Sequence, residues 1–193
     1  MKDGELSGIY LKTNKYLLWR SEVVANLKTD HFDFEVPNGP VDVNAIREYR
    51  ETLSGEIPKS FLEFLQTWNG VITPFGKFGQ FDLTEDDDDE YGAVKILYGL
   101  FDASSHKDLR NASNGYRFKD RVPNTYTAIG ADNSWNQICL NLEDGTVWQW
   151  YPGEPWEPSD IYEPTTEFLR PVAPSFDQFW NALVEVDEAD FCP

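Results

Sequence analysis

Carboxylates are the most abundant side chains in this chain that could take part in chemistry. The 193 residues include 34 Asp and Glu against 16 Lys and Arg, which gives a formal net charge of −18. Two carboxylates placed together can act as the acid and the base or nucleophile of a glycosidase. Among 34 carboxylates, however, such pairs arise by chance. A carboxylate-based hydrolase therefore stays an alternative function, which a deep pocket with two converging carboxyl groups of raised pKa would reveal.

Other residue types that carry chemistry are few. The two histidines, His31 and His106, lie in no HExxH or Cys/His pattern, so a zinc site lacks ligands at the usual spacing. The chain has no GxSxG elbow, no Walker loop and no GxGxxG. Of its two cysteines, Cys139 lies in an apolar stretch and is expected to be a buried free thiol. We therefore expect no catalytic residues, no cofactor and no metal centre, and hence a protein that is not an enzyme.

The strongest local pattern is the acidic run from Glu85 to Glu90. An EF-hand counted from Asp86 would need Gly at position 6, where Tyr91 stands, and Glu at position 12, where Leu97 stands. The run is therefore not an EF-hand, although weak association with a divalent cation stays open. Two interpretations remain, a solvated loop without a specific task and a surface that binds a basic partner.

The negative charge is concentrated in the second part of the chain. Residues 1–84 hold 9 basic and 12 acidic residues, whereas residues 85–193 hold 7 and 22. Such a field repels nucleic acid and anionic membranes and attracts a basic protein. Aromatic residues beside the acidic loops are of the type that dominates binding hot spots, although packing in the core is the alternative for Trp148, Trp150 and Trp156. The candidate partner contacts are Asp86, Asp87, Asp88, Asp89, Glu90, Trp135, Glu154, Trp156 and Glu157.

Composition and the N-terminus indicate the class of protein and its compartment. The aromatic content of 15% supplies a core and argues against disorder. Residues 1–5 provide no basic start to a secretory signal, and the apolar runs are far shorter than the roughly 20 residues that span a bilayer. We therefore expect a compact domain in the reducing cytoplasm, with an oligomeric state that the sequence leaves open.

Two helices are expected in the first half of the chain, as part of the scaffold that positions the acidic loops. The first begins at an Asp42 cap and ends at Gly55, and the second runs from Pro58 to a left-handed exit at Asn69-Gly70. A third helix begins at a capping box formed by Ser175 and Gln178. A weak helix is expected around residues 104–114.

The strands are expected mainly between these helices. The candidates are residues 93–100, 126–129, 137–142 and 146–151, and residues 31–36 alternate like a half-buried strand. Asp144-Gly145 is the preferred pair for a two-residue type I′ hairpin, which would place Leu140 opposite Gln149. This order predicts an α+β fold with a single, mainly antiparallel twisted sheet and helices packed against it. We expect an N-terminal extension of short strands over residues 1–40, a domain over 41–184 and an acidic tail over 185–193.

Four of these segments, in this order, resemble the SUKH superfamily, the Smi/Knr-like domain named after a yeast regulator of cell-wall synthesis. Residues 56–70 resemble its "LP…(Y/F)…FL…NGG" helix, with Val71 in place of the second Gly, and residues 97–100 resemble its short strand ending in Gly. Residues 127–150 resemble its "IG.D..GN..CLDL.DG.VY.W" block, and residues 173–183 its closing helix.

The resemblance implies an α+β fold and a role in binding other proteins. Bacterial members commonly act as immunity proteins that neutralise polymorphic or contact-dependent toxins, frequently nucleases, whereas eukaryotic members act as regulators or scaffolds. The family has no established catalytic residues to carry over. Together with the acidic charge and the expected cytoplasmic location, the resemblance predicts an immunity protein for a basic toxin, with a regulatory or scaffold domain as the alternative.

Overall fold

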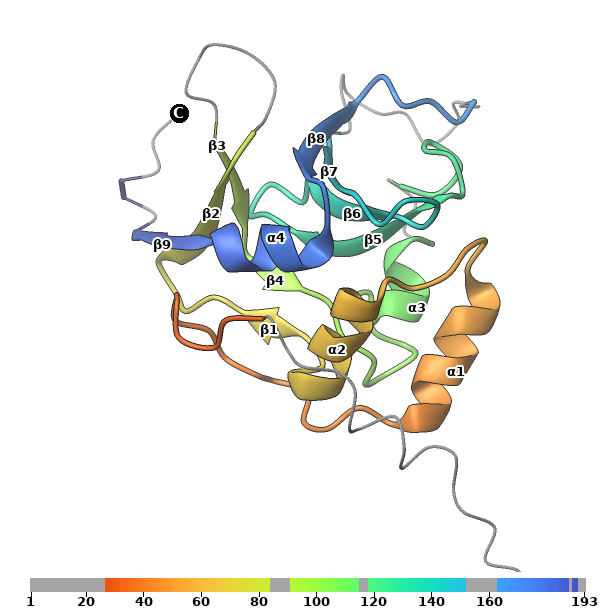
Figure 1. Cartoon of the computed structure of the whole chain (residues 1–193), viewed down its shortest axis with the longest axis horizontal. Coiled ribbons are helices and arrows are strands. Elements are labelled where there is room, and N and C mark those ends of the chain that lie inside the picture. Colours follow the sequence, from red (N-terminus) through yellow and green to blue (C-terminus); the bar gives the residue numbers. More distant parts are fainter. Residues whose placement is uncertain (1–26, 84–90, 115–117, 152–162, 188, 191–193) are drawn as a thin grey trace, which may run out of the picture.

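The computed structural model describes residues 27–83, 91–114, 118–151, 163–187 and 189–190 (Figure 1). These residues form two antiparallel sheets and four helices. The six-stranded sheet has the order β1-β4-β5-β6-β7-β8, and the three-stranded sheet has the order β3-β2-β9. The strands are β1 (Val71–Ile72), β2 (Lys77–Asp82), β3 (Tyr91–Val94), β4 (Ile96–Leu97), β5 (Tyr126–Ala131), β6 (Gln137–Asn141), β7 (Val147–Trp150), β8 (Leu169–Ala173) and β9 (Val184–Asp187). The helices are α1 (Val43–Thr52), α2 (Lys59–Thr67), α3 (Leu109–Ala112) and α4 (Phe176–Ala182).

The predicted α+β class with an antiparallel sheet and packed helices is confirmed, but the expectation of a single sheet missed the second, smaller one. The stretch predicted as one strand over residues 93–100 is divided at Lys95. Its backbone N–H donates to Ala131 O at 2.8 Å, and its carbonyl accepts from Thr73 N at 3.0 Å. The residues before Lys95 pair with β2 and those after it pair with β1 and β5. One apolar run therefore serves two sheets.

The helix ends test the residues that the sequence predicts as caps. Asp42 caps α1 by accepting from Asn44 N at 2.9 Å, and Ser175 caps α4 by accepting from Gln178 N at 3.4 Å. Asn69 ends the second helix with a φ of 52°, as predicted. Gly55 is not a left-handed cap, because α1 already ends at Thr52 with an extended cap residue. A Cβ at Gly55 would instead lie 2.8 Å from Leu142 Cβ, so this glycine allows close packing.

The register predicted for the β6–β7 hairpin is wrong by two residues. Leu140 pairs with Val147 rather than with Gln149, so the turn contains four residues, 142–145. Gly145 N–H donates to Asn141 O at 2.8 Å, and Leu142 N–H donates to Thr125 O, on the β5 side, at 2.8 Å. Because the shift is an even number of residues, each side chain keeps its predicted face.

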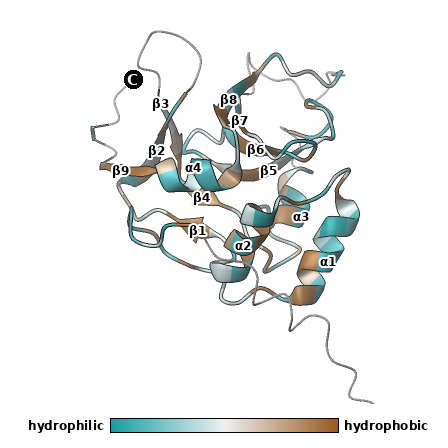
Figure 2. Ribbon diagram, in the orientation of Figure 1, coloured by the Kyte–Doolittle hydropathy of each residue, from teal (hydrophilic) through white to brown (hydrophobic). Residues whose placement is uncertain are grey.

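Aromatic side chains fill the contact between α2 and α4. The ring of Phe61 lies 4.9 Å from that of Phe176, and the ring of Trp180 lies 5.2 Å from Phe64 and 4.9 Å from Trp68. In Figure 2 the side of α4 that faces the viewer is largely hydrophilic, which agrees with burial of its aromatic residues on the opposite side. Each such pair adds about 0.5–1.5 kcal/mol beyond area burial.

The N-terminal extension is described from Leu27 onward. Its alternating segment predicted a strand, but among its described residues Glu35 alone pairs, in an isolated bridge with Ile72. Phe32 instead packs its ring 5.3 Å from that of Trp180. The alternation thus reports packing against the aromatic core rather than a regular strand.

The segment predicted as an acidic tail begins inside the fold. Residues 184–187 form β9, in which Val184 pairs with Gln80 and Asp187 pairs with Lys77 of β2. The side chain of Lys77 also forms an ion pair with Glu185. The carboxylates of β9 are therefore held on a sheet edge.

Candidate functional site

The structure places one of the predicted partner contacts, Trp135. The acidic contacts Asp86, Asp87, Asp88, Asp89 and Glu90, together with Glu154, Trp156 and Glu157, lie outside the described residues. Trp135 lies in the connection between β5 and β6, and 43% of its surface is exposed. It is therefore available to a partner, whereas the other candidate contacts stay predictions.

The loop that presents Trp135 is folded around the carboxylate of Asp132. Asp132 Oδ1 accepts from the N–H groups of Ser134 (2.8 Å) and Asn136 (2.9 Å), and Oδ2 accepts from Asn136 Nδ2 (2.8 Å). Burial raises the pKa of the Asp132 carboxyl, although hydrogen bonds from Asn136 and Ser134 oppose the shift. These bonds hold Trp135 at a φ of 64°, which residues with a Cβ rarely adopt.

A second aspartate, the fully buried Asp108, organises the loop that precedes α3. Asp108 Oδ2 accepts from the N–H groups of Phe101 (2.8 Å) and Asp102 (3.1 Å), and both carboxylate oxygens accept from the guanidinium of Arg110 at 2.8 Å. Burial raises the pKa of Asp108, but the hydrogen bonds from Arg110 and Phe101 outweigh it, so the pKa lies below its ordinary value. The carboxylate therefore stays ionised at neutral pH and fixes the loop.

Two adjoining hollows lie beside these two loops. The first is bordered by Pro37, Asn38 and the Asp108 loop, and the second by Lys107 and the Asp132 loop. Their volumes are about 230 Å³ and 200 Å³, and both are lined by Ile72, Ile96 and Lys107. Ile72 and Ile96 are paired residues of β1 and β4, so the sheet provides an apolar floor. Phe101 lines the first hollow and Trp135 lines the second. We call this surface the Lys107 groove: it consists of the two hollows with their shared floor and the two loops as walls.

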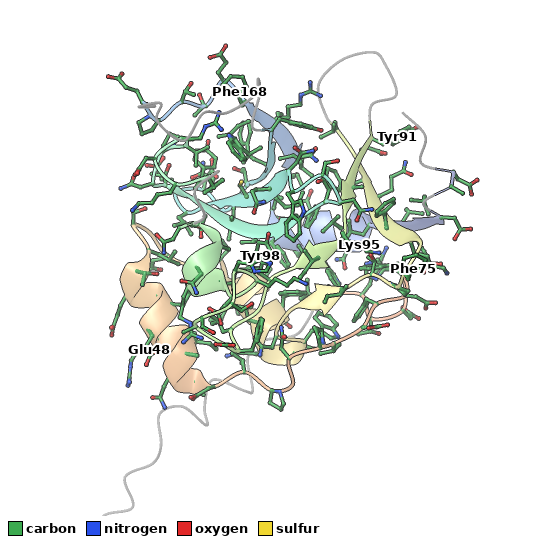
Figure 3. The ribbon with its side chains drawn as sticks, turned by 180° about the vertical axis from the view of Figure 1, so that it is seen from behind. Glu48, Phe75, Tyr91, Lys95, Tyr98 and Phe168 are labelled. Carbon is green, nitrogen blue, oxygen red and sulfur yellow. The ribbon has the colours of Figure 1, made fainter. Side chains whose placement is uncertain are left out.

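The two ends of β4 are fixed by the polar side chains Lys95 and Tyr98, which Figure 3 shows from behind. Lys95 Nζ donates to Pro74 O at 2.7 Å and to Lys77 O at 3.0 Å, and it lines the second hollow. Tyr98 OH donates to Gln137 Oε1 at 3.1 Å, and burial raises the pKa of this phenol above its usual range. Tyr98 is therefore neutral and structural, while Lys95 adds a fixed positive charge to the groove.

The groove walls approach each other through an aromatic contact. The ring of the exposed His106 lies 5.9 Å from the ring of Trp135 in an edge-on arrangement. Sequence reasoning identified Trp135 but missed Phe101, His106 and Lys107 as neighbours, because they are distant in sequence and follow no motif. The loop contacts around Asp108 bring them together.

No cluster of three or more His, Cys, Asp or Glu residues that could hold a metal ion occurs in the part of the chain that the structure covers. None of the helices that it describes is both long and apolar enough to span a membrane. The arrangement of a lysine between apolar hollows can bind a ligand by contact and charge.

Carboxylates gather separately, at the three-stranded sheet. The hydrogen bond from Lys77 to Glu185, together with the charges of Asp33 and Asp187, raises the pKa of Lys77. Asp33 N–H also donates to Glu185 Oε2 at 2.9 Å. This acidic edge lies on the sheet whose strands β2 and β3 flank the run at residues 85–90.

Two tryptophans with alternative interpretations serve mainly as packing residues. Trp150 is 1% exposed and packs its ring 5.4 Å from Phe118. Trp148 is half-buried, 6.1 Å from the ring of Tyr126, and donates through Nε1 to Thr146 Oγ1 at 2.7 Å. These contacts favour the core interpretation for both residues.

Sequence comparison relates this chain to known proteins. A curated relative, the SPbeta prophage-derived uncharacterized protein YokK of Bacillus subtilis (strain 168), is 25% identical over 158 residues, which cover 75% of this chain and 76% of the relative. The sequence model of the SMI1 / KNR4 family (SUKH-1) matches residues 40–182. Since this match spans most of the chain, the protein belongs to the SMI1 / KNR4 (SUKH-1) family.

Proposed function

We propose that this protein is a non-enzymatic immunity protein, which binds a cognate toxin one-to-one and blocks its active site or the path of its substrate. The toxin is a basic protein of the nuclease type, from a polymorphic or contact-dependent system. The proposal is carried by the net charge of −18 in a chain of a family that is commonly associated with immunity proteins.

The charge supports this proposal through the chemistry of nucleases. A nuclease holds phosphates with Lys and Arg, so the surface that binds its substrate is positive. An acidic inhibitor is attracted to that same surface, and steered association can reach about 10⁸–10⁹ M⁻¹s⁻¹ at low salt, against about 10⁵–10⁶ without steering. The acidic run at 85–90 and the β9 carboxylates Glu185 and Asp187 are the contacts that we assign to this attraction, with Glu154 and Glu157 as further candidates.

The immunity function predicts a large toxin gene directly upstream of the gene for this chain, and the decisive experiment uses the product of that gene. The two proteins are co-expressed and purified together, and the mass of the complex and the cleavage of DNA and RNA are measured. We expect a one-to-one complex, complete inhibition at equimolar protein and an association rate that falls steeply with salt. A complex that leaves cleavage intact would contradict the proposal.

The regulatory or scaffold alternative predicts a different result in the same experiment. A scaffold domain would bind several cellular proteins with modest affinity and would not inhibit the neighbouring gene product. Absence of inhibition, together with reproducible binding of host proteins by the purified chain, would favour this alternative.

A further inference from the structure

We infer that the Lys107 groove binds a segment of a partner protein that carries a carboxylate flanked by apolar side chains. This inference deepens the proposed function, since the segment would belong to the toxin. It assigns to the toxin a local acidic projection on an otherwise basic surface.

The charge of the groove is opposite to that of the whole protein. Lys95 and Lys107 both line the second hollow, against one lining carboxylate, Asp132, which accepts hydrogen bonds from its own loop. No described carboxylate lies within ion-pair distance of Lys107. The groove is thus a cationic site within a chain of net charge −18, and its complement is a carboxylate.

Apolar contacts supply the second part of the recognition. Phe101 and Trp135, one on each wall, both have 43% of their surface exposed. Ile72 and Ile96 form the floor below them. Half-exposed aromatic side chains beside an apolar floor are the anchors of protein interfaces. Each hollow, of about 230 and 200 Å³, has room for one apolar side chain.

The backbone conformation of Trp135 indicates that its surroundings fix the direction of the side chain. A non-glycine residue with a φ of 64° is strained, and such strain persists where the surroundings fix it. The bonds of Asp132 provide that restraint on one side. On the other side the indole lies against His106 rather than in the core. The loop therefore holds an aromatic side chain outward, at the edge of the groove.

These features indicate where each group of the partner segment binds. The carboxylate of the partner lies at Lys107, which both hollows share, and the flanking apolar side chains enter the two hollows. A short capped peptide, acetyl-Leu-Glu-Phe-amide, reproduces this pattern, and acetyl-Leu-Gln-Phe-amide is its neutral match.

The test titrates each peptide into ¹⁵N-labelled protein and follows the amide and indole resonances. We expect saturable shifts at Trp135 and Lys107 with the Glu peptide and roughly two- to fivefold weaker binding of the Gln peptide, the usual effect of one exposed charge pair. Lys107→Glu should abolish the preference for Glu over Gln. Trp135→Asn, chosen because Asn tolerates a positive φ, should weaken binding by about fivefold or more. Lys119→Glu changes an exposed lysine that does not line the groove and should leave binding unaltered.

Two outcomes would overturn the inference. One is the absence of saturable shifts at Trp135 and Lys107 up to the solubility limit of the Glu peptide. The other is equal binding of both peptides by the wild-type protein and by Lys107→Glu. The toxin experiment separates the two proposals: a toxin that binds wild type and Lys107→Glu equally refutes the groove alone. A toxin that is not bound at all refutes the immunity function, and the peptides still decide the groove.

Discussion

Replacement of Asp108 by Asn tests whether a buried carboxylate builds the wall of the groove. Asp108 is 0% exposed, and its two oxygens accept from the N–H groups of Phe101, Asp102 and Arg110 and from the guanidinium of Arg110. Asn offers one acceptor oxygen, so the donors on one side then face an amide NH₂. Two lost bonds, one to a backbone donor at about 1 kcal/mol and one to a charged donor at about 1.5–3 kcal/mol, give a sum of about 2.5–4 kcal/mol. Because Arg110 is partly exposed and can turn to water, we expect a loss of about 2–3 kcal/mol of unfolding free energy.

The measurement is urea unfolding of the wild-type protein and Asp108→Asn over a range of pH. The pKa of Asp108 is lowered in the folded state, so its contribution is fully present above the unfolded pKa of about 3.9 and is lost as the pH falls through the folded pKa. The difference between the two proteins should therefore be constant at neutral pH and shrink below about pH 4. Glu48→Gln is the matched control, since Glu48 is 58% exposed and contacts the same guanidinium at 3.3 Å. A loss of under about 1 kcal/mol for Asp108→Asn, or a loss equal to that of the control, would refute the reasoning.

Three further predictions concern packing, charge and reactivity. Gly55→Ala places a Cβ 2.8 Å from Leu142 Cβ and should destabilise the fold by about 1–3 kcal/mol in urea unfolding, whereas unchanged stability would mean that the loop shifts freely. Replacement of Asp86–Asp89 by Asn should lower the association rate with the toxin and flatten its salt dependence in stopped-flow measurements, with unfolding unchanged; an unaltered rate would remove this run from the interface. Burial raises the pKa of the Cys139 thiol. In a Cys192→Ser variant, which leaves Cys139 as the single cysteine, this thiol should therefore react with a thiol reagent only after unfolding. Rapid labelling of the folded variant would contradict the position of Cys139 in the core.

Elements specified by local chemistry could be predicted from the sequence. The caps at Asp42 and Ser175 and the left-handed residue Asn69 depend on hydrogen bonds or dihedral angles within a few residues, and the structure confirms all three. The predicted register of the β6–β7 hairpin is wrong, although Asp144-Gly145 is a strong turn signal. Side-chain hydrogen bonds decide the register. A two-residue turn needs the N–H groups of Glu143 and Thr146 for its closing pair, but these groups donate to Asn141 Oδ1 at 3.1 Å and to Asp144 Oδ1 at 3.0 Å.

The groove could not be predicted because its parts are far apart in the chain. Ile72, Ile96, Lys107 and Trp135 belong to four different segments, and no spacing rule connects them. The sequence predicts Trp135 as a contact from its residue type and its place in a loop among acidic segments. Its positive φ, the observation that sets it apart, arises from the hydrogen bonds that Asp132 makes and is invisible in the sequence.

Under the proposed function, the acidic surface and the cationic groove act on different steps of binding. A field from many carboxylates acts over roughly 10 Å in 0.1 M salt and governs the encounter, so any basic protein is attracted. The groove acts at contact and retains only a partner that presents a carboxylate between apolar side chains. Basic host proteins would then associate fast and leave fast. We therefore expect changes in the acidic run to alter the association rate and Trp135→Asn to alter the dissociation rate, and an effect of both on the same rate constant would contradict this division.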